Sequence, residues 1–231
     1  MNIRRFLDLI GVELNPSSFA EKAISGMGGF LAIFMIFQIS YWVLGSDAYL
    51  IVASMGAATV LLFAVPHGPL SQPWPLFGGN LISACIGVAS AQLIPDLFTA
   101  GAVAVGTAIA VMYFLKCIHP PGGATALSAV VGGEAVHSLG YMYVVTPVLL
   151  NVLVIFSVAV AFNWLFKWRR YPAKLVKKPK YVPTAKPAVS HEGIEHALRQ
   201  IDSFIDVSEE DLNEIYRLAR AFDQKSDKKP D

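Results

Sequence analysis

Residues 117–125 have the sequence Cys-Ile-His-Pro-Pro-Gly-Gly-Ala-Thr and lie within a long apolar region. The consecutive prolines Pro120 and Pro121 stop a preceding helix, because they lack the backbone N–H donors that a helix requires. Gly122 and Gly123 then permit close approach of another backbone. Irregular backbone at membrane depth is tolerated only where protein or a water-filled cavity surrounds it. The stretch therefore predicts an interrupted helix inside a membrane domain.

The sequence on both sides of this stretch is almost free of charge. Between Gly29 and Phe166 the acidic and basic residues are Asp47, Asp96, Lys116 and Glu134. About a quarter of the residues in a soluble domain are charged, so a domain this poor in charge predicts contact with lipid.

Six apolar segments are separated by turns or polar breaks. They are residues 23–44, 48–65, 77–94, 98–115, 121–131 and 143–166. The fifth segment is too short to cross a bilayer as a regular helix, because a crossing needs about 20 residues. We therefore expect an all-α polytopic membrane protein with about six transmembrane or re-entrant helices. Six crossings, or four crossings plus two re-entrant segments, both fit this pattern.

The charged residues outside these segments predict domain limits. We expect an amphipathic cytoplasmic segment at 1–22, a transmembrane domain at 23–166, a basic proline-containing linker at 167–189 and a cytoplasmic helical hairpin at 190–225. Ser18 and Glu21 have the spacing of a capping box at the start of the first membrane helix. The apolar face of the hairpin needs a covering partner, for which we expect a second copy of the chain.

The basic residues also predict the orientation. Residues 167–187 contain eight lysines and arginines and no acid, which predicts a cytoplasmic segment near acidic lipid headgroups. Arg4, Arg5 and Lys22 place the N-terminus on the same side, so the number of crossings is even. We expect a multi-pass protein of the inner or plasma membrane with both termini in the cytoplasm.

An internal similarity suggests two related halves. Residues 56–61 read Gly-Ala-Ala-Thr-Val-Leu and residues 122–127 read Gly-Gly-Ala-Thr-Ala-Leu. Each stretch lies in the middle segment of a group of three, and Asn80 and Asn151 would also correspond. The pattern predicts two three-helix inverted repeats, with a binding site where the two interrupted helices meet.

The candidate site gathers around the N-termini of the two middle helices, because unpaired N–H groups and the positive end of the helix dipole bind anions. The expected substrate-binding residues are His119, Pro120, Pro121, Gly122, Gly123, Thr125, Gly56, Thr59, Asn80, Asn151 and Lys116. We expect His119 to contact the anion or to titrate; the alternative is a simple bond to a carbonyl. The threonines and asparagines have an alternative structural role within and between helices. Lys116 either extends to the interface or attracts anions.

The motif at His119-Pro120-Pro121, the following Gly-Gly-Ala-Thr and the hydrophobic layout of residues 20–166 resemble the HPP family of integral membrane proteins. Plant and cyanobacterial relatives in that family are associated with nitrite transport. The resemblance therefore implies that this chain has two partners. One is a small inorganic anion, with nitrite as a candidate, and the other is the lipid bilayer. Many bacterial relatives carry a nucleotide-binding domain, whereas here we expect no cofactor and no nucleic-acid partner.

We accordingly expect a transporter that holds a small anion between the 119–125 and 56–59 segments. The alternative is a membrane sensor or scaffold that signals through the C-terminal hairpin. A transporter should work without residues 190–231, and a sensor should not. We do not expect an enzyme, because the sequence has no nucleophile–base pair and no metal-ligand spacing in the apolar region.

Overall fold

The structure is a computed structural model that describes residues 18–44, 52–175, 207, 212–213 and 215–217. The expected N-terminal amphipathic segment up to residue 17, residues 176–189 of the expected linker and most of the expected hairpin lie outside the described residues. The described residues form helices and turns and no strand. The expected helical fold class is therefore confirmed for this part of the chain.

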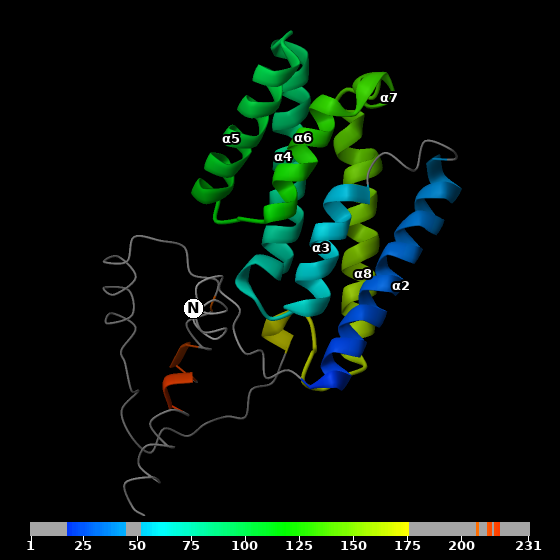
Figure 1. Cartoon of the computed structure of the whole chain (residues 1–231), viewed down its shortest axis with the longest axis vertical. Coiled ribbons are helices and arrows are strands. Elements are labelled where there is room, and N and C mark those ends of the chain that lie inside the picture. The colour runs from blue at the N-terminus through cyan, green and yellow to red at the C-terminus, as the bar shows by residue number, and fades with distance from the viewer. Residues whose placement is uncertain (1–17, 45–51, 176–206, 208–211, 214, 218–231) are drawn as a thin grey trace, which may run out of the picture.

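Seven α-helices are labelled in Figure 1. Their bounds are α2 Phe19–Leu44, α3 Val52–Ala64, α4 Pro73–Leu93, α5 Leu97–Phe114, α6 Pro120–Val131, α7 Gly133–His137 and α8 Leu150–Trp164. A π-helical segment, η3, spans Val144–Leu149, and short 3-10 turns span Pro69–Ser71 (η2) and Ala173–Leu175 (η4).

Four helical stretches are long and apolar enough to cross a membrane. These are Phe19–Trp42, Pro73–Leu93, Leu97–Phe114 and Val144–Trp164. The shorter helices α3 and α6 have 13 and 12 residues. Since a regular crossing needs about 20 residues, neither can span the bilayer alone.

The helices begin where the sequence offers a cap or a proline. The Ser18 hydroxyl accepts from the backbone N–H of Glu21 at 3.1 Å, which confirms the Ser18 half of the predicted capping box of α2. The Asp96 carboxylate accepts from the backbone N–H of Thr99 at 2.8 Å and from its hydroxyl at 2.7 Å, which caps α5. Pro120 begins α6, where the missing N–H costs no helical hydrogen bond.

The sixth apolar segment, residues 143–166, is long enough to cross as predicted, but it is not one continuous helix. Thr146 has φ −132° and ψ 108°, and Pro147 follows it inside the segment. A proline cannot donate to the preceding turn and moves the residue before it out of the helical region. The last membrane-length stretch therefore consists of η3 followed by α8, and η3 packs on α4.

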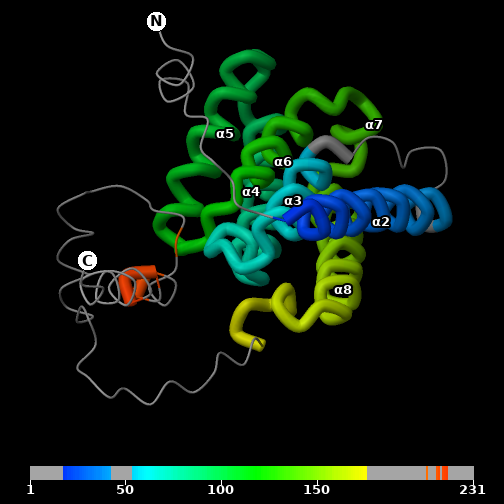
Figure 2. The backbone as a smooth tube through the Cα atoms, turned by 60° about the horizontal axis from the view of Figure 1, so that its bottom comes forward, coloured from blue at the N-terminus to red at the C-terminus, as the bar shows by residue number. Residues whose placement is uncertain are grey.

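The helices alternate in direction. Figure 1 shows α2, α4 and α6 running one way and α3, α5 and α8 running the other way. Helix α4 packs on α5 and α6, α2 packs on α3 and α8, and α3 also contacts α6. The tube in Figure 2 shows α3 and α6 near the middle of the molecule, with α5 and α8 further out.

Glycines allow α4 and α6 to approach closely. A Cβ atom on Gly87 would lie 2.4 Å from the Ala126 carbonyl oxygen, and one on Gly79 would lie 2.5 Å from the His119 Cβ. No real side chain fits at these distances, so both positions require glycine. The expected site stretch is thus held directly against α4.

The segment that follows α8 belongs to the helical domain and not to an extended linker. Tyr171 is fully buried and donates its hydroxyl to the Ser71 carbonyl at 2.8 Å, and the Ala173 N–H donates to the Gln72 side chain at 3.1 Å. The packed domain therefore continues to Leu175, beyond the limit predicted at residue 166. The 66–72 turn and the 167–175 segment consequently lie at one end of the molecule, where Figure 1 also shows the start of α2.

Candidate functional site

The N-terminus of α6 is formed by the His119-Pro120-Pro121 motif, which the sequence analysis identified. His119 is extended, with φ −143° and ψ 102°, and it is the N-cap residue of α6. Pro120 and Pro121 have no N–H, and the Gly122 N–H donates to the His119 carbonyl at 2.8 Å. The helix end therefore retains its partial positive charge but offers fewer free donors than we expected.

His119 is the most unusual side chain at this end. It is fully buried, and its Nδ1 lies 3.0 Å from the Leu70 carbonyl oxygen. A carbonyl can only accept, so Nδ1 carries the hydrogen and donates it. Nε2 is buried and has no hydrogen-bond partner among the residues that the structure describes. A buried polar atom in this state requires an explanation, because leaving it unpaired costs free energy.

The neighbouring polar residues form a completed network. The Thr125 hydroxyl donates to the Asn80 side-chain oxygen at 2.7 Å, and the Asn80 amide donates to the Leu76 carbonyl at 2.8 Å. The Tyr143 hydroxyl donates to the Thr125 carbonyl at 3.3 Å. All of these groups are buried. Thr125 and Asn80 thus join α6 to α4, which is the structural alternative that the sequence left open.

The two glycines of the motif differ in their surroundings. A Cβ on Gly122 would lie 2.6 Å from the Gly79 carbonyl oxygen and 2.9 Å from the Ser83 hydroxyl oxygen. A Cβ on Gly123 would meet only a Val105 methyl group at 4.0 Å. Gly122 therefore packs against α4, and Gly123 has room for a side chain.

The other expected polar residues bond to partners away from His119. The Thr59 hydroxyl donates back to the Met55 carbonyl at 2.7 Å, and a Cβ on Gly56 would have no atom within 4 Å. Asn151, in the first turn of α8, accepts from the Ser40 hydroxyl at 2.7 Å, and its Nδ2 is buried without a partner among the described residues. The structure thus brings His119, Pro121, Gly122, Thr125 and Asn80 together at the α4–α6 contact.

Lys116 lies in the connection that leads to His119. It is exposed and has a left-handed backbone with φ 54°. The Trp74 indole N–H donates to the adjacent Leu115 carbonyl at 3.0 Å, and His119 binds Leu70. This connection therefore lies at the same end of the molecule as the 66–72 turn.

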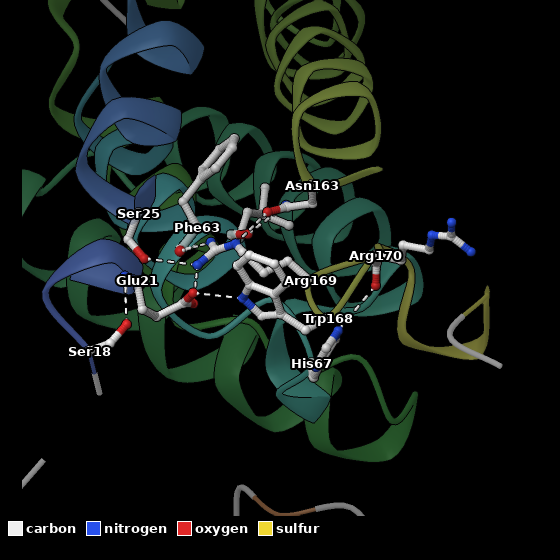
Figure 3. Close-up of polar contacts among 10 residues, drawn as sticks. Ser18, Glu21, Ser25, Phe63, His67, Asn163, Trp168, Arg169 and Arg170 are labelled. Carbon is white, nitrogen blue, oxygen red and sulfur yellow. Dashed lines mark hydrogen bonds and ion pairs between the residues drawn. The ribbon is translucent and has the colours of Figure 1, made fainter. Parts of the chain in front are cut away.

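A buried arginine is the main polar residue that the sequence analysis missed. Figure 3 shows Arg169 surrounded by groups from three segments. It is 1% exposed, forms an ion pair with Glu21, and donates to the Ser25 hydroxyl, the Phe63 carbonyl and the Asn163 side chain. Arg169 was expected among the basic residues near lipid headgroups. It instead joins α2, the carbonyl end of α3 and the end of α8.

Two neighbours complete this cluster. The Trp168 indole N–H donates to Glu21 at 2.9 Å, and the Asn163 amide donates to the Leu62 carbonyl at 3.2 Å. The last carbonyls of α3 thus receive side-chain donors, which a short helix end buried in protein requires. The sequence signal for this arrangement is an acidic residue in the first turn of α2 together with an arginine just after α8.

A small cavity lies at the opposite end of the domain. Its volume is about 110 Å³, and it is lined by α4, α6 and α7 residues that include Gln92, Ala129 and His137. The His137 ring bonds to the Val130 carbonyl at 2.8 Å. None of the expected site residues lines this cavity. The described residues also contain no cluster of three histidine, cysteine or carboxylate side chains that could hold a metal ion.

Comparisons with known proteins place this arrangement in a family. A transmembrane protein of Dictyostelium discoideum is 33% identical over 177 residues, which cover 74% of this chain and 57% of the relative. A second transmembrane protein of that organism is 33% identical over 151 residues, covering 63% of this chain and 53% of the relative. The chain thus spans about half the length of the curated relatives it matches. No solved structure matches the chain.

The family comparison covers the described domain almost completely. The family described as HPP, transmembrane region, matches residues 14–172. This range includes the His119-Pro120-Pro121 motif, helices α2 to α8 and the buried Arg169. The chain is therefore a multi-pass membrane protein that belongs to the HPP transmembrane family.

Proposed function

We propose that the protein carries a small inorganic anion across the membrane and that nitrite is the first anion to test. The observation that carries this proposal is the pair of contacting short helices, α3 and α6, inside a domain of four membrane-length helical stretches. Interrupted helices at the centre of a membrane domain are the usual place of a transporter's binding site.

The arrangement of helices supports two inverted repeats. One repeat would contain α2, α3 and α4, and the other α5, α6 and η3–α8, with the two triplets running in opposite directions (Figure 1). A two-fold axis that exchanges the triplets would map α2 onto α5, α3 onto α6 and α4 onto α8. The α2–α3 contact would then correspond to α5–α6, the α2–α8 contact to α4–α5, and the α4–α6 contact to α3–α8. Each of these contacts occurs, and α3–α6 would map onto itself.

The anion site that we propose is at the N-terminus of α6. The positive end of the helix dipole and the unpartnered Nε2 of His119 are the groups that a ligand there would meet. Lys116 is exposed in the adjoining connection and would attract anions toward this end.

We propose that this end faces the cytoplasm. The basic residues Lys167, Arg170 and Lys174 lie in the segment that packs against the 66–72 turn, and cytoplasmic segments are enriched in such residues. The turn at Asp96 and helix α7 with Glu134 would then face the opposite side of the membrane.

The test is anion flux into liposomes that contain the purified full-length chain. Nitrite, formate, nitrate and chloride would each be supplied outside, and their entry would be compared with entry into protein-free liposomes. We expect protein-dependent entry of at least nitrite. If none of the four anions enters faster than in protein-free liposomes, the proposed transport function is wrong.

A further inference from the structure

We propose that the site binds its anion together with one proton. The species that it recognises is then a small weak acid, and the anion alone is not recognised. This inference rests on the proposed function and specifies its cargo. It begins from the buried Nε2 atom of His119, which has no hydrogen-bond partner among the described residues. The chemistry of that atom determines what a ligand must offer.

The Leu70 carbonyl determines the tautomer of the His119 imidazole. Nδ1 must carry a hydrogen in order to donate to Leu70, so the neutral ring presents a lone pair at Nε2. A lone pair repels an anion and accepts a hydrogen bond from a donor. Only a ligand with an O–H or N–H group can therefore pair with neutral His119.

Among the residues that the structure describes, the elements that pack around His119 carry no carboxylate that could stabilise a protonated ring. The ionisable groups on the described elements that pack around it are His67 before η2, Cys85 on α4, Tyr113 on α5, Lys116 and Cys117 in the connection, and Tyr143 before η3. The 167–175 segment, which packs against the 66–72 turn, adds Lys167, Arg169, Arg170, Tyr171 and Lys174. None of these groups is an acid that is charged at neutral pH. A buried imidazolium or a buried anion would each be costly alone, whereas the two together form a neutral pair.

The proton balance follows directly. The O–H group of the acid donates to Nε2, and the proton is either shared or moved to the ring, which leaves the anion beside an imidazolium. On release the proton returns to the anion or leaves with it on the same side. Each cycle moves one anion and one proton, no net charge crosses the membrane, and His119 returns to its neutral form.

Two measurable properties distinguish this cargo from a bare anion. Transport should respond to a pH gradient and not to a membrane potential, because the transported pair is neutral. Anions of weak acids, such as nitrite and formate, should be moved in preference to nitrate and chloride, whose acids are too strong to share a proton with the ring.

The experiment uses the full chain in liposomes that contain a pH-sensitive dye, with the potential clamped by potassium and valinomycin. Flux in protein-free liposomes is subtracted at every pH, because nitrous and formic acids cross bilayers unaided. We expect the entry of nitrite and formate to acidify the interior by one proton per anion. The rate of entry should not depend on the membrane potential. Protein-dependent entry that follows the potential and carries no proton would overturn this inference and leave anion transport intact.

Two variants separate the roles of the two ring nitrogens. In His119→Asn the amide nitrogen takes the place of Nδ1 and keeps the bond to Leu70, while the group at Nε2 is removed. In His119→Gln the amide reaches the position of Nε2 but cannot take up a proton. We expect His119→Asn to remain folded and to lose proton-coupled flux by about tenfold or more. We expect His119→Gln to move fewer protons per anion than the wild type.

The opposite result would assign His119 a structural role. If His119→Asn retains wild-type proton-coupled flux, the bond to Leu70 is the contribution of this residue, and the inference is wrong. The proton-to-anion ratio of the wild type tests the same inference independently. The inference can therefore be overturned even if both His119 variants are unstable.

Discussion

At the scale of single residues, Arg169 holds three helices at one end of the domain. Its guanidinium pairs with Glu21 and also donates to Ser25, Phe63 and Asn163, so its removal leaves several buried acceptors unpaired. We expect Arg169→Met to destabilise the protein by about 3 kcal/mol or more. Arg169→Lys should also destabilise it, because a lysine cannot direct donors to all of these acceptors.

The control for this prediction is Lys167→Met, which removes an exposed basic residue two positions earlier. The thermal unfolding of all three variants is measured in detergent. The readout is the loss of the monodisperse peak in size-exclusion chromatography. A melting temperature for Arg169→Met equal to that of Lys167→Met would show that the buried contacts of Arg169 contribute nothing.

The two motif glycines give a second prediction at this scale. In Gly122→Ala the new methyl group would lie 2.6 Å from the Gly79 carbonyl oxygen, and the backbones of α4 and α6 would have to separate. We expect a loss of about 1–3 kcal/mol. Gly123→Ala places its methyl group 4.0 Å from a Val105 methyl group and should be neutral or stabilising by up to about 1 kcal/mol.

The same detergent melting assay compares these two glycine variants. Equal melting temperatures would mean that the close α4–α6 contact does not depend on Gly122. Flux should be measured on Gly123→Ala as well, because this variant changes the helix end without disturbing the packing.

At the scale of the helices, the cap of α5 responds to pH. The hydroxyl and N–H of Thr99 donate to the Asp96 carboxylate and hold its pKa below the ordinary value of 3.8. Because the pKa is lower in the folded state, the charged cap stabilises the fold above the unfolded-state pKa. That contribution disappears as the pH falls through the folded-state pKa.

Asp96→Asn is the variant that tests this dependence, since asparagine also caps helices but does not titrate in this range. We expect the melting temperatures of the wild type and Asp96→Asn to converge as the pH is lowered below 4. Glu134→Gln serves as the control, because it removes another acidic residue of the same end. A pH-independent difference between wild type and Asp96→Asn would contradict the assigned role of the carboxylate.

The helix limits that the sequence predicted best are those set by local chemistry. Ser18 and Pro120 act on their own neighbours, so the starts of α2 and α6 were predicted from the sequence. The cap at Asp96 is equally local but was not predicted. The break at Thr146 was missed although Pro147 is a local signal, because the surrounding residues are uniformly apolar and suggest one continuous helix.

The contacts of the candidate site were less predictable, because they depend on which helices meet. The motif at His119 was identified, but its bond to Leu70 joins residues 49 positions apart. The bond between Thr125 and Asn80 and the packing of Gly122 on Gly79 are likewise contacts between helices. Arg169 was assigned to the lipid surface because its partner Glu21 lies at the other end of the domain sequence.

At the scale of the whole molecule, the first prediction concerns the two faces. Single cysteines at Lys116 and Lys167 should react with a membrane-impermeant reagent from the cytoplasmic side, and cysteines at Asp96 and Glu134 from the opposite side. The background would carry Cys85→Ala and Cys117→Ala, since both native thiols are free. Labelling of position 116 and position 134 from the same side would contradict the proposed inverted repeat.

The last prediction concerns how much of the chain is needed for transport. The described domain ends at Leu175, and the 167–175 segment contributes the buried Arg169 and Tyr171. A chain that stops after residue 175 should fold and should carry the same anion at a similar rate, because the transport site that we propose lies within α4 and α6. A chain that stops after residue 166 should be unstable in detergent, because it loses both buried side chains and the bond from Tyr171 to Ser71. Size-exclusion chromatography and liposome flux on the two truncations give the comparison. A 1–175 chain that inserts and remains monodisperse but moves no anion, beside a full-length chain that does, would show that the C-terminal residues are required and would favour the sensor or scaffold alternative.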